Sequence, residues 1–326
     1  MVCAVKEVKG IIKQQNVIPA RGKRESKTFF AGIAQAVERR TENPCVPSST
    51  LGPGTVFPLI FFDTHSHLNF PQFEADLPSV VERARQNKVS DILVVGTDAE
   101  SNRKAVRIAS EYNLWAALGL HPSEIETDNP ALPGIKELLP NNRVVAIGEI
   151  GLDYAFRRGG VISPPEKERQ IEVFRFLLKT AIEINLPIII HSRDAAEDTL
   201  NALRQAGPAQ GVWHCFSGDV KLAEEILGLG FFISFTANIT YRKNESLRQV
   251  VRAVPLERLL LETDCPFMPP EGKRGQRNEP AYIPLLAKAI AEIKQADIAE
   301  VAEKTYNNSR ALFLNSDFHR SISVIK

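Results

Sequence analysis

Hydrophobic and polar positions follow two different periods from residue 59 onward. Short apolar runs, rich in β-branched or aromatic residues, alternate with longer segments in which apolar residues recur every three or four positions. The short runs predict strands at 59–62, 91–95, 114–118, 143–147, 187–190, 211–214, 231–235 and 258–262. The longer segments predict helices at 77–88, 100–111, 130–139, 166–184, 195–205, 219–229, 245–253, 281–294 and 297–313.

Each of the eight predicted strands is followed by a helix. Nearly continuous apolar strands are typical of parallel sheets that are covered on both faces. Eight such units in roughly 255 residues match the size of a (β/α)₈ barrel, so we predict an α/β fold of TIM type. The alternative is an open doubly wound sheet, which usually carries a glycine-rich turn after its first strand. Here the first strand is followed by Asp-Thr-His-Ser-His at 63–67 instead.

The first 58 residues differ from the rest of the chain. Their apolar periodicity is weak, and 43–58 is rich in Pro, Gly, Ser and Thr. We expect 1–58 to be an extension without function, either disordered or a leader translated from upstream of the true start. The barrel is expected over 59–316, and 317–326 is expected to be a tail.

Charge and composition exclude several classes of protein. No apolar run approaches the roughly 18 to 20 residues that span a bilayer, and lysines interrupt the N-terminus, so we expect a cytoplasmic protein without membrane association. The four cysteines show no pairing pattern. Residues 1–60 contain nine Lys or Arg and four Asp or Glu, whereas the remainder contains 31 and 35 and has a net charge of −4. With this net charge, residues 61–326 are unsuited to strong non-specific binding of duplex nucleic acid. A nucleic-acid substrate would therefore be bound over a few nucleotides or at an end.

Metal-binding side chains collect at the predicted strand exits. Five of the six histidines lie there: His65, His67, His121, His191 and His214. Carboxylates follow the fourth and eighth strands, and the exits of all barrel strands meet at one mouth. Imidazole and carboxylate ligands without thiolate suit Zn, Mn, Fe or Ni, whereas Mg prefers oxygen. So many candidate ligands exceed the four of one tetrahedral structural ion and fit two cations that share a carboxylate.

Six motifs together carry a family resemblance. The stretches FFDTHSHLNF, LGLHP, GEIGLDY, IIIHSRDA, GVWHCFSG and LLLETDCPFMPP resemble the TatD family of metal-dependent deoxyribonucleases, within the amidohydrolase-like barrels. The resemblance runs from about residue 60 to 315, with the motifs in the family's order. Two positions depart from the usual pattern: Ser66 stands where the family often has Cys or Ala, and Asn69 where it often has Asp. Neither is a predicted ligand.

The resemblance implies a barrel with a distorted, metal-binding C-terminal mouth and two divalent cations, Zn, Mn or Mg. It assigns His65, His67 and Asp264 to one cation. It assigns His191 and His214 to the other, with Glu149 as the bridge. It further implies catalytic roles for Glu149 and Asp264, and a DNase of 3′–5′ exonuclease type acting on single-stranded DNA or DNA ends. No obligate protein partner is expected.

Three residues outside this ligand set are candidates for substrate binding. We expect His121 to contact the substrate phosphate; the alternative is a capping role before Pro122. The planar fork of Arg193 suits phosphate, with a salt bridge to a neighbouring aspartate as the alternative. Asn278, in the basic loop after the eighth strand, is expected to line the substrate groove together with Arg277, although such loops are usually just solvated.

Other residues are expected to support the ligands, and two other functions stay open. Asp153, Glu262 and Ser217 are expected to orient ligand imidazoles. The same activated water could serve another hydrolase that acts on an ester, amide, lactone or phosphotriester. A metal-binding protein without catalysis is the remaining alternative, which a catalytic Asp264 argues against.

Overall fold

A computed structural model describes residues 59–125, 134–155 and 162–315 of the chain. The predictions for the extension 1–58 and the tail 317–326 lie outside these residues. The strands are β1 (Phe61–Ser66), β2 (Val89–Val95), β3 (Trp115–Leu118), β4 (Val144–Asp153), β5 (Ile188–Arg193), β6 (Gly211–Trp213), β7 (Phe232–Phe235) and β8 (Leu259–Leu261). The α-helices are α2 (Leu77–Gln86), α3 (Ala99–Tyr112), α4 (Ile135–Leu138), α5 (Pro164–Glu183), α6 (Ala196–Ala206), α7 (Val220–Gly228), α8 (Glu245–Ala253), α9 (Ile283–Lys294) and α10 (Ile298–Phe313).

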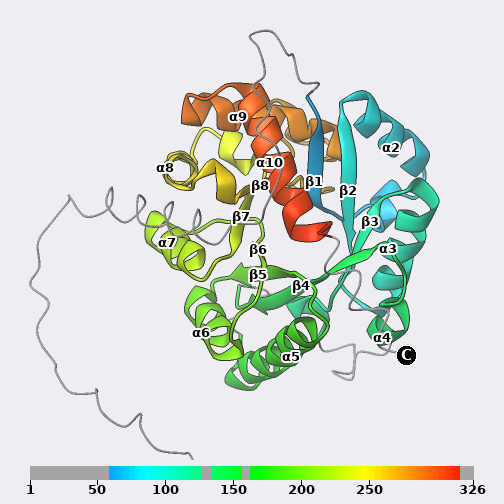
Figure 1. Ribbon diagram of the computed structural model, residues 1–326, viewed down its shortest axis with the longest axis vertical. Helices are drawn as coiled ribbons and strands as arrows, with labels where there is room; N and C mark the ends of the chain where they lie inside the picture. Colours follow the sequence, from blue (N-terminus) through cyan, green and yellow to red (C-terminus); the bar gives the residue numbers. More distant parts are fainter. Residues whose placement is uncertain (1–58, 126–133, 156–161, 316–326) are drawn as a thin grey trace, which may run out of the picture. The chain divides into compact units, whose positions relative to one another are not determined.

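The eight strands form one parallel sheet in the order β1 to β8, with each strand paired to the next. The first and last strands meet at their carboxyl ends, where Ser66 and Cys265 form a parallel bridge. The His67 N–H donates to the Cys265 carbonyl at 2.8 Å across the same junction. The helices lie outside the strands (Figure 1). The predicted TIM-type barrel is therefore confirmed.

Apolar side chains from the strands and from the end of α10 form one buried cluster. The cluster contains Phe62, Leu93, Val95, Ala117, Val145, Ala146, Ile189, Val212, Leu260, Leu312 and Phe313. The last two come from the end of α10, and the ring of Phe313 lies 6.2 Å from that of Phe62. The end of α10 therefore packs against the strands as part of the core of the barrel.

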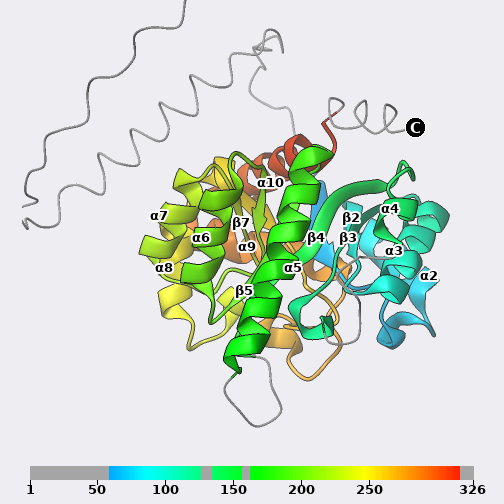
Figure 2. The same cartoon turned by 90° about the horizontal axis from the view of Figure 1, so that it is seen from below.

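Helix starts are fixed by side chains that satisfy free backbone N–H groups. Asp98 accepts hydrogen bonds from the N–H groups of Glu100 and Ser101 at the start of α3. At the start of α5, Glu166 accepts from the Ser163 N–H at 2.8 Å in a capping box. The long α5 then runs along the outside of the barrel, with α6 on one side and α4 on the other (Figure 2). None of the helices in the described part of the chain is long and apolar enough to span a membrane.

Strands β1, β4 and β5 extend further than their apolar runs predict. Glu149 and Asp153 were expected after the fourth strand, but both lie within β4. The reason is that the ladder between β4 and β5 continues past the apolar residues, with Gly151 opposite His191 and Asp153 opposite Arg193. The predicted helix at 130–139 is described only from residue 134 onward, where it contains α4.

Candidate metal centre

The backbone at the carboxyl ends of the strands is irregular. The pairing register shifts in β1 between Asp63 and Ser66, and in β4 between Ile147 and Ile150. Non-glycine residues with a left-handed backbone follow three strands: Asp194 after β5, Cys215 after β6, and Asp264 with Met268 after β8. Such conformations are costly and collect at functional sites, where the surrounding structure holds side chains in fixed directions. This end of the barrel is the distorted mouth that the sequence predicts.

Four side-chain atoms converge at the exit of β1. The Nε2 atoms of His65 and His67 lie 3.2 Å apart. Glu149 Oε2 lies 3.4 Å from the first and 3.8 Å from the second. Asp264 Oδ1 lies 3.8 and 3.4 Å from the same two atoms. We call this group, which consists of His65, His67, Asp264 and Glu149 Oε2, the His65 cluster.

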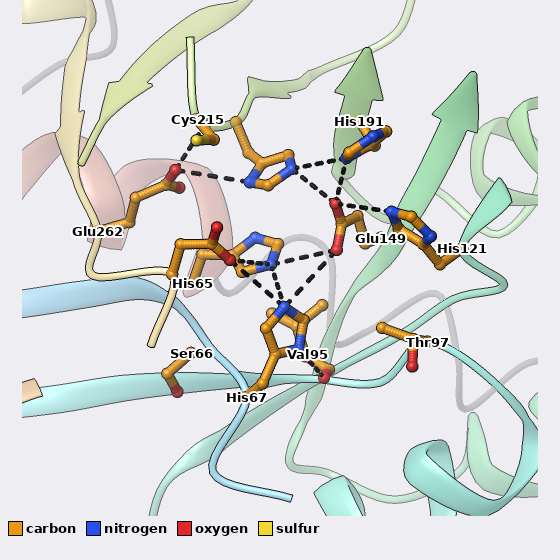
Figure 3. Close-up of polar contacts among 12 residues, drawn as sticks. His65, Ser66, His67, Val95, Thr97, His121, Glu149, His191, Cys215 and Glu262 are labelled. Carbon is orange, nitrogen blue, oxygen red and sulfur yellow. Dashed lines mark hydrogen bonds and ion pairs between the residues drawn. The ribbon is translucent and has the colours of Figure 1, made fainter. Parts of the chain in front are cut away.

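A second group surrounds the other oxygen of Glu149 (Figure 3). Glu149 Oε1 lies 2.6 Å from His191 Nδ1 and 2.6 Å from His214 Nε2. These two nitrogens lie 3.2 Å apart. We call this group, which consists of His191, His214 and Glu149 Oε1, the His191 cluster. All six predicted ligands thus lie in two adjacent clusters that share one carboxylate.

The Glu149 carboxylate is buried, with a side-chain exposure of 4%. Burial would raise the pKa of this carboxyl group, but the charges of His214, His121 and His191 hold it well below its usual range. The backbone of Glu149 packs against Gly119, where a Cβ atom would lie 2.4 Å from the Glu149 nitrogen and oxygen. Glycine at 119 therefore allows the exit of β3 to approach the bridging residue.

The donors of both clusters fit divalent cations. Four ligands at the about 2.0–2.1 Å typical of zinc lie roughly 3.4 Å from one another in a tetrahedron. The five distances that involve the two imidazole nitrogens of the His65 cluster span 3.2 to 3.8 Å, close to this spacing. Among the described residues, no Lys or Arg forms an ion pair with Glu149 or Asp264, so the buried carboxylates have only imidazoles as partners. A cation bound among these donors would offset the carboxylate charge.

Further hydrogen-bonding groups orient the imidazoles from behind, as ligand histidines generally require. His67 Nδ1 lies 3.1 Å from the Val95 carbonyl oxygen. In the His191 cluster the supporting groups are carboxylates instead: Asp153 Oδ2 lies 3.2 Å from His191 Nε2, and Glu262 Oε1 lies 3.5 Å from His214 Nδ1. Asp153 is therefore within hydrogen-bonding distance of its imidazole, whereas Glu262 lies at ion-pair distance and His214 Nδ1 has no hydrogen-bond partner among the described residues.

The two supporting carboxylates differ in how they are held. Glu262 accepts hydrogen bonds from the Cys215 N–H at 2.6 Å and from the Ser234 hydroxyl at 2.7 Å, which fixes its position. Asp153 accepts from the Ala155 N–H at 3.0 Å. Ser217, the third expected orienting residue, lines the pocket above the clusters.

The electrostatic environment differs between the two clusters. Burial would lower the pKa of His214, but the charge and hydrogen bond of Glu149, together with the nearby Glu262, raise it well above its usual value. The pKa of His191 is also raised, because Glu149 and Asp153 outweigh burial. In contrast, burial and the nearby His214 lower the pKa of His65. Both imidazoles of the His191 cluster thus hold a proton more readily than His65 does.

A pocket of about 710 Å³ opens over both clusters, and two of the predicted substrate residues line it. His121 Nε2 lies 3.6 Å from Glu149 Oε1. Its Nδ1 accepts a hydrogen bond from the Ser123 N–H at 3.1 Å, so the capping role considered as the alternative and a pocket-facing nitrogen coexist in one ring. Arg193 is exposed, and no carboxylate in the described ranges lies within ion-pair distance of it. The salt bridge considered as an alternative for Arg193 is therefore absent from this part of the chain.

The third predicted substrate residue does not reach the pocket. Asn278 is fully buried, and its Nδ2 donates to the carbonyls of Thr263 at 2.9 Å and Phe267 at 2.7 Å. Its neighbour Arg277 donates to both carboxylate oxygens of Asp76. The loop after β8 uses both polar side chains to fix its own backbone, so neither is free to line a substrate groove in this conformation.

Asp63, which lies two residues before His65, has no role predicted from the sequence. Its carboxylate is fully buried and accepts hydrogen bonds from the Thr263 N–H at 2.9 Å and the Thr263 hydroxyl at 2.6 Å. Burial raises the pKa of Asp63 to about 7. These bonds tie the exit of β1 to the residue before Asp264 and so align the two halves of the His65 cluster. The sequence feature that could have indicated this role is an acidic residue directly after an apolar run.

Comparison with known proteins identifies relatives over the barrel. Residues 62–314 match the family model described as TatD related DNase. The chain is 43% identical over 258 residues to the uncharacterized metal-dependent hydrolase YabD of Bacillus subtilis, which covers 78% of this chain and 99% of the relative.

Solved structures agree with this match. The crystal structure of YjjV, a TatD homologue from Escherichia coli, is similar with a TM-score of 0.71 and 35% identity, and covers 78% of this chain and 98% of that one. A TatD family hydrolase from Entamoeba histolytica has a TM-score of 0.69 and 26% identity, over 79% and 99% of the two chains. Imidazoles and carboxylates from several barrel strands converge at one mouth and, together with these relatives, this shows that the chain belongs to the TatD-related DNase family and is a metal-dependent hydrolase.

Proposed function

We propose that this chain hydrolyses phosphodiester bonds in DNA, using two divalent cations of zinc, manganese or magnesium. The observation that carries the proposal is the position of Glu149, whose two oxygens face two separate groups of imidazoles. Adjacent cation sites that share a carboxylate are typical of enzymes that displace groups on phosphorus. We further propose cleavage from the 3′ end of single-stranded DNA or of DNA ends.

Different residues would bind each of the two cations. His65, His67 and Asp264 would hold one cation, His191 and His214 the other, and Glu149 would contact both. When bound, such cations lower the pKa of a water molecule and offset charge that develops on phosphoryl oxygens. The supporting contacts of Asp153 and Glu262 keep the imidazoles of the His191 cluster aimed at their site.

Asp264 is the proposed proton acceptor. Burial would raise the pKa of its carboxyl group, but a hydrogen bond to His67 and the charges of His65 and His67 lower it, so the group is ionised at neutral pH. Its side chain is 13% exposed and lines the pocket. An ionised carboxylate at this position can take a proton from the attacking water and return it to the leaving oxygen.

His121 and Arg193 are the proposed phosphate contacts. Burial lowers the pKa of His121 to about 3, so the ring is neutral at neutral pH. Its Nδ1 lies 3.1 Å from the Ser123 nitrogen and 2.7 Å from the Ser123 hydroxyl, and its Nε2 faces the clusters. With the ring proton on Nε2, His121 can donate a hydrogen bond to a phosphate oxygen. The exposed guanidinium of Arg193 can bind a phosphate at the edge of the same pocket.

The substrate class follows from the charge of the barrel. Beyond residue 60, acidic residues outnumber basic ones by 35 to 31, which is unfavourable for tracking along duplex DNA. A strand end or a short single-stranded segment needs only a few local contacts. The pocket, with Arg193 and His121 beside the two clusters, suits such a local grip.

The test uses the full chain after removal of metal, with zinc, manganese or magnesium added back. Single-stranded DNA labelled at either end, duplex DNA, RNA, a phosphodiester dye, a lactone, an amide and a phosphotriester are compared. We expect metal-dependent release of nucleotides from the 3′ end of single-stranded DNA. Hydrolysis of the lactone, amide or phosphotriester without any cleavage of phosphodiesters would overturn the proposal, as would bound metal without turnover on any substrate.

A further inference from the structure

The described residues include three exposed large hydrophobic side chains, Phe176, Phe267 and Leu285. Single exposed apolar residues are common on protein surfaces, so exposure alone indicates nothing. Phe267 differs from the other two because it lines the pocket over the metal clusters while 48% of the residue stays exposed. It follows Asp264 by three residues.

Phe267 belongs to a row of rings that begins at a predicted metal ligand. The ring of Phe70 is stacked on that of His67, with centroids 4.5 Å apart and an angle of 14° between planes. Phe267 meets Phe70 edge to face, at 6.2 Å and 78°. Phe70 also lines the pocket. The two phenylalanines thus form an aromatic wall, which we call the Phe70–Phe267 wall, directly beside the His65 cluster.

The backbone of Phe267 is held firmly although its ring is exposed. The Phe267 N–H donates to the Asp264 carbonyl at 3.0 Å, and the fully buried Asn278 donates to the Phe267 carbonyl at 2.7 Å. The backbone of Asn278 is itself fixed, because its N–H donates to the Pro266 carbonyl at 3.1 Å. The loop therefore presents the ring at a fixed place relative to Asp264, as a binding surface requires.

The residues that line the pocket differ in chemistry. The aromatic wall flanks the His65 cluster, and Arg193, which follows His191 by two residues at the end of β5, lines the same pocket. An aromatic face next to a site for phosphate, with a guanidinium in the same pocket, matches a nucleotide that is bound through both its base and its backbone. Aromatic side chains stack on any base, because every base has a π-face.

We propose that Phe70 and Phe267 form a stacking site for the nucleobase next to the scissile phosphate. The inference rests on the proposed phosphodiesterase function and extends it to a preference for substrates whose end carries a base. In this arrangement the phosphate lies over the two clusters, the base lies on the ring of Phe267, and the strand continues toward Arg193.

The experiment compares two single-stranded oligonucleotides that differ only at the cleaved end. One ends in a normal nucleotide, and the other ends in a residue in which hydrogen replaces the base. The measured quantity is the ratio of kcat/KM for the two substrates, in the full chain loaded with the cation that supports activity. We expect the wild type to prefer the base-bearing end by about 5- to 150-fold, as one stacked base would produce.

Three variants sharpen the result. Phe267→Ala should reduce the preference toward 1, mainly through KM, and Phe267→Trp should retain or increase it. Phe176→Ala removes an equally exposed phenylalanine on α5 and should keep the wild-type preference. An unchanged preference in Phe267→Ala would overturn the stacking site while leaving the nuclease proposal intact. Failure of the wild type to cleave either oligonucleotide would overturn the proposed function and the stacking site together.

Discussion

The two clusters at the barrel mouth share Glu149 but are built differently. The His65 cluster gathers four donors, and its His67 is oriented by a backbone carbonyl, that of Val95. The His191 cluster gathers three donors, and carboxylates orient both of its imidazoles. One cluster can close a tetrahedral shell with protein atoms alone, whereas the other leaves a position for water or substrate.

This difference suggests a division of roles. A site with a full set of protein ligands anchors its cation, and a site with an open position exchanges ligands during turnover. Carboxylate partners make imidazoles more basic and strengthen their hold on a cation, which compensates for the missing fourth donor. We therefore expect the two clusters to respond differently to substitution, to loss of their supporting groups and to pH.

The largest effect should come from the shared carboxylate. Glu149→Gln removes the negative charge from both clusters and should cost three orders of magnitude or more in kcat/KM, since each cation contributes several kcal/mol and each ~1.4 kcal/mol is a factor of ten. Metal content by mass spectrometry should fall at both sites. Glu172→Gln, on the exposed side of α5, should match the wild type. Retention of both metals with full activity would show that Glu149 does not bridge them.

Removing one imidazole from each cluster should separate the two sites. His214→Ala leaves the four donors of the His65 cluster intact, so we expect one bound cation and a loss of activity on the order of 10²- to 10³-fold. His65→Ala should weaken cation binding in the His65 cluster. The cation that remains, in the His191 cluster, should then be the more exchangeable one. Competition with a chelator measures the number of cations bound in each variant and how readily each is released. Equal and complete loss of metal in both variants would contradict two distinguishable sites.

Loss of the supporting carboxylates should act on the His191 cluster alone. Asp153→Asn and Glu262→Gln should each weaken cation binding there by about 10- to 100-fold, as is typical for groups that orient ligand histidines. Occupancy of the His65 cluster should not change. Asp198→Asn is the matched control, because this carboxylate accepts a hydrogen bond from the Tyr154 hydroxyl rather than from a ligand. A loss at both sites in either variant would favour general disruption of the mouth.

Lowering the pH should release the cation from the His191 cluster before it releases the cation from the His65 cluster. Cations bind neutral imidazole, so a histidine whose pKa is raised must release a proton before it binds metal. Both imidazoles of the His191 cluster have raised pKa values, whereas in the His65 cluster that of His67 is raised and that of His65 is lowered. Affinity therefore falls as pH decreases through the raised values, first at the His191 cluster. Equilibrium dialysis from pH 8 to 5 measures this order, and loss from the His65 cluster first would contradict it.

Much of the barrel could be predicted because its strands are apolar on both faces. Runs such as Ile188–Ile190 are fully buried, and a continuous apolar run of that length is typical of a parallel strand. The five histidines at strand exits were recognisable because a barrel brings all its strand ends to one mouth. Which of these histidines lie in which cluster depends on side-chain direction, for which the resemblance to a family was needed.

Other features depended on contacts between distant segments. Asn278 lies in a polar, basic stretch that suggested a groove, but its amide is buried against carbonyls 10 to 15 residues away. The continuation of β4 to Asp153 depends on pairing with β5 rather than on apolar character. The position of Phe267 beside the His65 cluster depends on the fold of the loop after β8. None of these contacts leaves a periodic signal in the sequence.

The central claim is that Glu149 lies between two cations, and anomalous diffraction from crystals soaked with manganese or zinc tests it most directly. The account predicts two anomalous peaks, one among His65, His67 and Asp264 and one between His191 and His214, on opposite sides of the Glu149 carboxylate. A single peak, or two peaks of which one does not contact Glu149, would contradict it.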